Sequence, residues 1–74
     1  MKLIDLLNKI SMEDIEPIYY FRINYCGYNL IIKYLYYTFE IIDVKTTYDI
    51  TLLKKGDSFD PFILGAINYE IEEY

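Results

Sequence analysis

The sequence has no histidine, no tryptophan and a single cysteine, Cys26. Without histidine, the chain can form neither a Ser-His or Cys-His nucleophile pair nor an imidazole metal site, which excludes most hydrolase and zinc templates. A lone cysteine cannot form an internal disulfide, and its neighbours Tyr25 and Gly27 supply no cation to activate the thiol. These absences predict a non-enzymatic protein with a structural thiol in a reducing, cytoplasmic compartment.

Glycine-rich loops and long apolar runs are missing as well. The three glycines are widely separated and none lies in a phosphate-binding motif, so we expect no nucleotide and no other cofactor. The longest apolar stretch, residues 28–42, is interrupted by Lys33 and Glu40 and is shorter than the ~20 residues that a membrane helix needs. The opening segment carries charges at Lys2 and Asp5, unlike a signal peptide. We therefore expect neither secretion nor a membrane partner.

The negative charge is confined to the end of the chain. The 74 residues contain 12 acidic and 7 basic side chains, which gives a net charge of -5. Residues 1–56 hold equal numbers of each, whereas residues 57–74 hold acidic residues and no base. Binding to a nucleic-acid backbone requires a surplus of Lys and Arg, so direct nucleic-acid binding is disfavoured. A basic surface on a host protein or complex is the expected partner.

The first residues have the pattern of an amphipathic helix. Over residues 2–10, apolar side chains recur at helical spacing with polar residues opposite; these side chains are Leu3, Leu6, Leu7 and Ile10. Ser11 and Asp14 then have the spacing of a capping box, and Pro17 disfavours helix at the preceding residue. We expect a single helical turn or a tight loop there.

The middle of the chain predicts antiparallel strands. Seven of the ten tyrosines fall between residues 18 and 44, mixed with Ile, Phe and Leu, and these residue types are enriched in strands. We expect strands at 18–25 and 28–36, joined by a turn at Cys26–Gly27, and a third strand at 38–44. In the third strand, Phe39 and Ile41 would share one face, with Thr38, Glu40 and Ile42 on the other.

Two apolar runs in this region do not alternate, namely Leu30–Ile32 and Ile41–Ile42. Either both faces of the sheet are covered, one by the helix and one by a partner, or the sheet is unusually exposed. The tyrosines favour core and cross-strand packing over a stacking platform for bases, because Arg22 and Lys33 are too few to form a basic groove. Tyrosines in excess of the core would serve as interface anchors.

The last third of the chain is less uniform. Residues 46–56 fit either a helix, with Thr46 as its cap and Gly56 as its terminator, or a strand in which apolar residues alternate, and both alternatives stay open. Asp57 and Asp60 mark a loop, in which they either turn the chain or ligate a hard cation; the spacing is not that of a calcium loop, so turning is favoured. From residue 67 to residue 72, regular alternation predicts a strand with one buried and one solvated face.

The acidic end is the candidate binding site. Glu70 and Glu72 would project from one strand face about 6.7 Å apart. With the neighbouring carboxylates they would form an acidic ridge that imitates a nucleic-acid backbone toward a basic groove, and the alternative is a solvated edge strand whose charges block unwanted pairing. The candidate partner-binding residues are Asp57, Asp60, Tyr69, Glu70, Glu72, Glu73 and Tyr74.

The opening MKLIDLLNKI, followed by an acidic segment, Pro17 and the strand IYYFRINY, resembles short bacteriophage and prophage proteins. Those proteins begin with an MKLI-type helix, an acidic turn that ends in proline and a tyrosine-rich strand. The resemblance covers residues 1–25, and SMEDIE stands where that class has a glycine-containing turn. It implies no catalytic residue. It implies a context, the host cytoplasm, in which small acidic phage proteins, anti-CRISPR proteins among them, bind and inhibit host proteins.

Together these patterns predict one α+β domain spanning residues 1–74, with the N-terminal helix on a mostly antiparallel sheet of four or five strands. The leading functional hypothesis is a small acidic protein-binding module, such as an anti-defence inhibitor of a host complex that handles nucleic acid. The alternative is a self-associating assembly protein whose tyrosine-rich sheet forms a homodimer interface.

Overall fold

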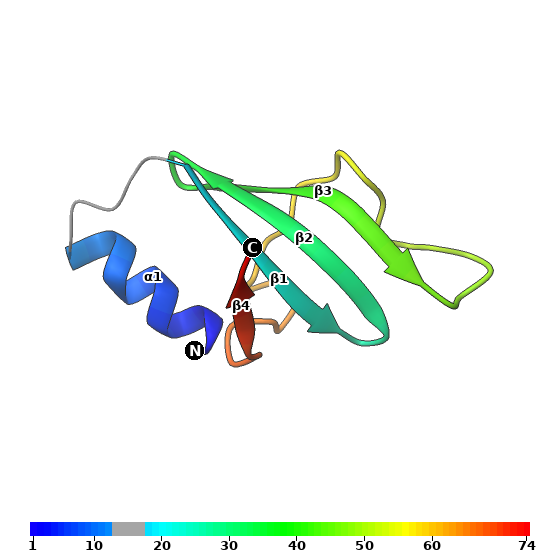
Figure 1. Cartoon of the computed structure of the whole chain (residues 1–74), viewed down its shortest axis with the longest axis horizontal. Helices are drawn as coiled ribbons and strands as arrows, with labels where there is room; N and C mark the ends of the chain where they lie inside the picture. Colours follow the sequence, from blue (N-terminus) through cyan, green and yellow to red (C-terminus); the bar gives the residue numbers. More distant parts are fainter. Residues whose placement is uncertain (13–17) are drawn as a thin grey trace.

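The computed structural model describes residues 1–12 and 18–74. Within those residues the elements are, in chain order, α1 (Leu3–Met12), β1 (Ile18–Tyr25), β2 (Tyr28–Leu35), β3 (Thr38–Thr46) and β4 (Ile71–Glu73). The strands form one antiparallel sheet in the order β3-β2-β1-β4, and α1 lies beside its β4 end (Figure 1). The predicted α+β architecture, one helix packed on a small antiparallel sheet, is confirmed.

Helix α1 matches the predicted amphipathic pattern and runs two residues further. Leu3 and Leu6 are fully buried, and Ile10 packs against the same core. The first backbone N–H groups of a helix have no partner within it. Here the N–H of Leu3 donates to the carbonyl of Tyr69 (2.9 Å) and that of Ile4 donates to the carbonyl of Ile67 (2.8 Å). The segment before β4 therefore fixes the start of α1.

Ser11 lies in the last turn of α1. Its hydroxyl donates to the carbonyl of Asn8 (2.9 Å), so Ser11 continues the helix that begins at Leu3 and does not cap a new turn. The remainder of the predicted capping box, with Asp14, and the turn before Pro17 lie outside the described residues.

The three long strands are joined by two-residue turns. Cys26 and Gly27 have φ values of 48° and 86°, and Tyr36 and Tyr37 have φ values of 45° and 65°. Positive φ at both central residues is typical of the type I′ turn, whose twist matches that of the paired strands. The predicted turn at Cys26–Gly27 is confirmed. Strand β2 ends one residue before the predicted position because Tyr36 belongs to the second turn.

One face of the sheet, the inner face, forms the core. Phe21 and Ile23 of β1 pair with Ile32 and Leu30 of β2, and all four are buried. In β3, Ile41 pairs with Ile32 whereas Asp43 pairs with Ile31, so Ile42 is an extra residue at a bulge. The bulge restores the alternation of inward-facing and outward-facing side chains along β3. Phe39 and Ile41 face the core as predicted, and Val44 joins them.

The opposite face of the sheet, the outer face, carries polar and charged side chains, with Ile18, Tyr20 and Leu35 toward one end. Of the run Leu30–Ile32, only Ile31 turns outward, and it pairs with Arg22 on one side and Asp43 on the other. Ile31 is nevertheless 6% exposed, because the long side chains of Arg22 and Tyr74 flank it. The run Leu30–Ile32 therefore contributes one apolar residue, not a whole apolar stripe, to the outer face.

The residues between β3 and β4, 47–70, form an irregular connection that covers the inner face. In Figure 1 this connection passes behind the sheet. Its residues Phe59 and Ala66 are buried in the core. Its middle segment, 56–59, hydrogen-bonds to the free edge of β3, and directly after it Ile71, the first residue of β4, donates to the carbonyl of Met1 (2.7 Å). Both edges of the sheet are thus partly covered by short segments.

Residues 47–56 form neither the helix nor the strand predicted for 46–56; they form bends and turns. Thr46, the predicted helix cap, belongs to β3, and its hydroxyl donates to the carbonyl of Gly27 (3.0 Å). Gly56 does adopt a left-handed conformation, with φ of 93°, but it closes a turn in which Asp57 donates to the carbonyl of Lys54 (3.1 Å). Side-chain contacts with the β1–β2 turn, and not the local sequence pattern, determine the conformation of residues 47–56.

The strand predicted for residues 67–72 is shorter than expected, since β4 contains only Ile71–Glu73. The preceding residues form a turn in which Tyr69 donates to the carbonyl of Ala66 (3.0 Å). Their carbonyl groups are used by the first turn of α1, so they are not available for a sheet ladder.

Candidate functional site

The predicted acidic residues divide between the two edges of the sheet. Glu70, Glu72 and Glu73 lie at the β4 edge and are exposed. Asp57 lies beside β3, where its carbonyl accepts from the N–H of Ile41 (2.9 Å). Because β1, β2 and β3 separate Asp57 from β4, and because Glu72 pairs with Arg22 of the outer face whereas Glu73 pairs with Phe21 of the inner face, the structure does not form a single acidic ridge.

Contacts within the chain already engage several of these carboxylates. Glu70 lies 3.4 Å from the Met1 amino group, and its side chain is 73% exposed. The Asp57 carboxylate accepts from the backbone N–H of Lys54 (3.0 Å). Such exposed contacts weaken the field that the acidic end presents, without removing it.

Asp60 acts as a turn residue. Its carboxylate accepts hydrogen bonds from the N–H groups of Phe62 (2.9 Å) and Ile63 (3.3 Å), which holds the turn over residues 61–65. This is the Asx-type role favoured by the sequence over cation binding. Among the residues that the structure describes, no three His, Cys, Asp or Glu side chains are placed to hold a metal ion.

The two candidate tyrosines occupy opposite faces. The hydroxyl of Tyr69 lies 3.5 Å from the sulfur of Cys26, and its ring centroid is 5.2 Å from that of Tyr25 on the inner side. The hydrogen bond with Cys26 is the main cause that raises the pKa of Tyr69 above its usual 10.0. Tyr74 lies on the outer side, where the guanidinium of Arg22 is 5.7 Å from its ring centroid. Tyr74 is 66% exposed and is the more accessible of the two.

Most tyrosines of the sheet belong to the core. Tyr28 and Tyr34 are buried, and Tyr19 and Tyr25 pack against the core cluster. Tyr20, Tyr36 and Tyr37 are the exposed members of this group. Core and cross-strand packing therefore accounts for the majority, and a few aromatic rings remain at the surface.

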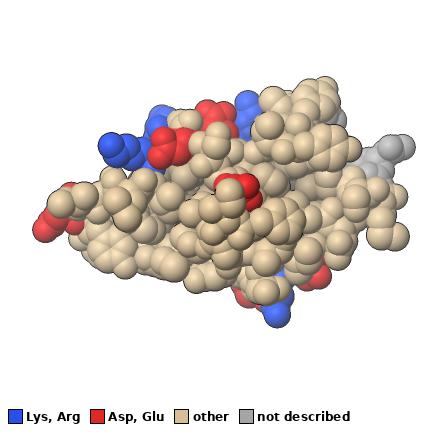
Figure 2. Space-filling model, turned by 180° about the vertical axis from the view of Figure 1, so that it is seen from behind, with Lys and Arg blue, Asp and Glu red and all other residues tan. Residues whose placement is uncertain are grey.

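The connection carries an exposed apolar set that the sequence analysis did not single out. Its members are more exposed than any side chain that packs the core. Figure 2 shows this side of the molecule, where uncharged residues form most of the surface, acidic atoms are visible near the middle, and the other charged side chains lie along the margins. The sequence feature that could have revealed this set is the presence of large apolar residues in segments that also contain turn-forming residues. The exposed apolar set consists of Tyr48 (50%), Ile50 (81%), Leu52 (82%), Phe62 (70%) and Ile63 (82%).

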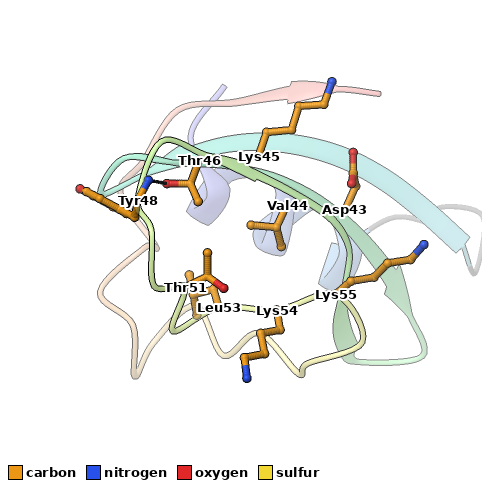
Figure 3. A pocket seen from close by; sticks show the side chains of 9 residues that line it. All are labelled: Asp43, Val44, Lys45, Thr46, Tyr48, Thr51, Leu53, Lys54 and Lys55. Atoms are coloured by element: carbon orange, nitrogen blue, oxygen red, sulfur yellow. Dashed lines mark hydrogen bonds between the residues drawn. The ribbon is translucent and has the colours of Figure 1, made fainter.

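A pocket of about 570 Å³, here called the β3 pocket, opens between β3 and residues 48–55 of the connection. Figure 3 shows Val44, Thr51 and Leu53 directed into the space between strand and loop. Lysine side chains extend from its rim, together with one carboxylate; these residues are Asp43, Lys45, Lys54 and Lys55.

Hydrogen bonds hold the loop that forms this pocket. The hydroxyl of Tyr48 donates to the carbonyl of Cys26 (3.0 Å), and the N–H of Tyr48 donates to the hydroxyl of Thr46 (3.2 Å). Further along, the N–H of Leu52 donates to the hydroxyl of Tyr28 (3.3 Å). Because Tyr28 is buried in the core, the pocket wall is tied to the most rigid part of the fold.

Comparison of the chain with protein-family models, with curated proteins and with solved structures gives no match. In the part of the chain that the structure describes, no helix has the length and apolar character needed to span a bilayer. The assignment of the candidate site residues therefore rests on the geometry of this chain alone.

Proposed function

We propose that this chain is a small protein-binding module that acts without catalysis. The observation that carries the proposal is the exposed apolar set on the connection. Ile50, Leu52 and Ile63 are each more than four-fifths exposed. Full burial of one such side chain stabilises a contact by roughly 1.5–3 kcal/mol, so covering several of them with a partner supplies most of a specific association.

The charge of the chain indicates the chemistry of the partner. The net charge is -5, and Glu70, Glu72 and Glu73 are exposed at the β4 edge. A partner with an apolar contact surface and basic margins is attracted at long range and then held by apolar burial. In the finer form of this proposal, the partner is the basic groove of a host complex that handles nucleic acid, and the chain inhibits it as an anti-defence protein; the resemblance of residues 1–25 to short phage proteins supplies this context.

The test compares capture by four forms of the chain immobilised at equal density in a lysate of the host cell. The forms are the wild type, I50S/I63S for the apolar contact, E70Q/E72Q/E73Q for the acidic edge, and E40Q/D43Q as a charge-loss control on β3. We expect the apolar variant to lose the captured protein at all salt concentrations. The acidic variant should differ from the wild type mainly at low salt, where exposed charges are least screened and contribute most to the attraction.

Two results decide the proposal. Equal capture by the wild type and I50S/I63S would show that the exposed apolar set is not the contact surface. Equal losses of capture per removed charge in E70Q/E72Q/E73Q, which removes three, and in E40Q/D43Q, which removes two, would show that net charge alone, and not the β4 edge, attracts the partner. Folding of each form is verified beforehand by the dispersion of its amide NMR spectrum.

Self-association is the second candidate function, and the β2–β3 hairpin favours it. Tyr36 and Tyr37 stand at its tip, 69% and 84% exposed, and the nearby Tyr20 is 37% exposed. Tyrosine rings of this kind are efficient interface anchors, also between two copies of one chain. Sedimentation over a micromolar concentration range separates the candidates: a dimer that dissociates on Y36S/Y37S supports assembly, and a monomer at all concentrations excludes it.

A further inference from the structure

The free edge of β3 is covered over only part of its length. The segment 56–59 bonds to the first part of this edge. The N–H of Ile41 donates to the carbonyl of Asp57 (2.9 Å), and the carbonyl of Phe39 accepts from the N–H of Phe59 (3.0 Å). Within the described residues, no backbone–backbone bond joins residues 43–46 to a segment beyond this edge. An open stretch of edge therefore follows the covered one.

The register shows which backbone groups of this stretch have no partner in the sheet. In an antiparallel pair alternate residues exchange hydrogen bonds, and the two residues that flank a two-residue turn form such a bonded pair. Leu35 and Thr38 flank the β2–β3 turn, so the odd-numbered residues of β2 bond to β3. Their partners after the bulge are Asp43 and Lys45. The N–H and C=O of Val44 therefore point away from β2, where another strand can bond to them.

The β3 pocket lies beside this open stretch. Its volume of about 570 Å³ is bounded by β3 on one side and by residues 48–55 on the other, and it lies in the range of ligand-binding pockets. Val44 and Leu53 are half-buried and extend into it from the two sides (Figure 3). Residues directly opposite each other in paired strands place their side chains on the same face. A strand that bonds to Val44 would therefore place one apolar side chain against Val44 and Leu53.

Opposite charges flank Val44 on the outer face of the sheet. Asp43 and Lys45 are exposed, and Figure 3 shows both side chains on the opposite side of β3 from Val44. In the part of the chain that the structure describes, neither side chain forms an ion pair. An antiparallel strand presents an acidic residue to Lys45 and a basic residue to Asp43 only if its own order is acidic, apolar, basic. The charges of β3 thus specify the direction and the register of an added strand.

We propose that an extended segment of a partner protein adds to the open edge of β3, with an acidic–apolar–basic order opposite Lys45, Val44 and Asp43. Main-chain bonds to Val44 and burial of the apolar side chain hold the segment, and the two charge pairs fix its register. The contact uses the edge of β3 and not the exposed apolar set, so it holds or fails apart from the proposed function.

The probe is the peptide acetyl-TTEVKT-amide, titrated at low salt while amide shifts are followed by NMR. We expect saturable shifts at Val44, Thr46 and Leu53. The peptide acetyl-TTKVET-amide has the same composition but places like charges opposite Asp43 and Lys45, so it should bind at least about threefold more weakly.

A third peptide, N-methylated at its valine, keeps every side chain and lacks the donor for the carbonyl of Val44. It should bind at least about tenfold more weakly than the parent peptide. Equal binding of these two peptides, or an absence of saturation with the parent, would overturn strand addition.

A charge swap in the protein tests the register. D43K/K45D should prefer TTKVET over TTEVKT by about the factor with which the wild type prefers TTEVKT. The matched control, K33E/E40K, reverses a cross-strand pair beside the covered part of the edge and should keep the wild-type preference. An unchanged preference in D43K/K45D, or a reversed one in K33E/E40K, would refute the proposed register. I50S/I63S should bind TTEVKT as the wild type does.

A second copy of this chain is the other occupant to test, because Asp43–Val44–Lys45 itself has the order acidic, apolar, basic. A two-fold axis at Val44 would, however, bring residues 48–55 of both copies to the same pocket, whereas a single extended segment carries no such loop. Sedimentation of the free protein decides between them. A monomer at micromolar concentration supports the partner segment, and a dimer that dissociates in D43K would overturn it.

Discussion

The backbone of Gly27 lies against the hydroxyl end of the Tyr48 ring. A Cβ atom at Gly27 would press against the Tyr48 hydroxyl and would lie 2.8 Å from Cζ of the same ring. The ring keeps this position through the bond from its hydroxyl to the carbonyl of Cys26 and through an edge contact with Tyr28, whose centroid is 5.2 Å away. One glycine therefore serves both the β1–β2 turn and the loop that forms the β3 pocket.

Replacement of Gly27 by alanine should destabilise the fold in two ways. The residue has φ of 86°, which costs an L-residue about 1 kcal/mol, and the new methyl group must displace Tyr48. We expect a total loss of about 2–3 kcal/mol in the free energy of unfolding, measured by urea denaturation.

Gly56 provides the matched control for this prediction. It has φ of 93°, but a Cβ atom there meets nothing within 4 Å. Gly56→Ala should therefore show only the conformational cost of about 1 kcal/mol. In a Tyr48→Ala background, Gly27→Ala should cost no more than Gly56→Ala; an undiminished cost there would contradict a steric role for Tyr48.

The β2–β3 turn is built from residues poorly suited to it. Tyr36 and Tyr37 both adopt positive φ, where Asn and Gly are the preferred residues. Tyr36→Asn should stabilise the protein by about 0.5–1 kcal/mol, because it relieves the left-handed strain at an exposed position. Tyr37→Gly should gain less, since it also removes the edge contact with Tyr34, whose centroid is 6.4 Å away. Thermal denaturation of the two single variants distinguishes these outcomes.

The sequence predicted the elements whose information is local. The spacing of Leu3 and Leu6, the aromatic strands and the turn at Cys26–Gly27 each follow from neighbouring residues, and the structure has α1, β1, β2 and β3 close to the predicted bounds. The conformation of the segment after β3 is instead determined by contacts with residues that are distant in the sequence. Tyr48 bonds to Cys26, and Leu52 bonds to Tyr28, and neither partner is visible in the local pattern.

The candidate site shows the same limitation. Asp57 and Glu70 are close in the sequence, but the connection carries the chain from the β3 edge to the β4 edge between them. Acidic residues that are close in the sequence therefore do not lie on one common surface of the fold. The three lysines of the β3 pocket show the reverse case, because Lys45 lies on a strand and Lys54 and Lys55 reach it only through the fold of the loop.

Tyr19 should make the stability of the fold sensitive to alkaline pH. Burial, and secondarily the charge of Glu73, raises the pKa of Tyr19 above the usual 10.0. Below pH 10 both states keep the phenolic proton. As the pH rises further, the unfolded chain releases this proton before the folded chain does, so the contribution of Tyr19 to stability is lost as the pH passes through its folded-state pKa.

Tyr19→Phe should therefore flatten the fall in unfolding free energy above pH 10, measured by urea denaturation at a series of pH values. Tyr36→Phe at the hairpin tip controls for the removal of one phenol. A fall as steep in Tyr19→Phe as in the control would contradict the role assigned to Tyr19.

Substitutions of Phe59 and Phe62 should have separate effects, the first on the stability of the fold and the second on partner binding. The two residues lie in one segment of the connection, but Phe59 is 2% exposed within the core cluster whereas Phe62 is 70% exposed. Phe59→Ala should cost about 3–5 kcal/mol and leave so small a domain largely unfolded, so Phe59→Leu, with a loss of about 1–1.5 kcal/mol, keeps the effect measurable. Phe62→Ala should change the unfolding free energy by less than about 0.5 kcal/mol and still weaken capture of the partner protein. A Phe62→Ala variant that binds normally would remove Phe62 from the contact surface, and one that unfolds would show that the connection depends on it for its own packing.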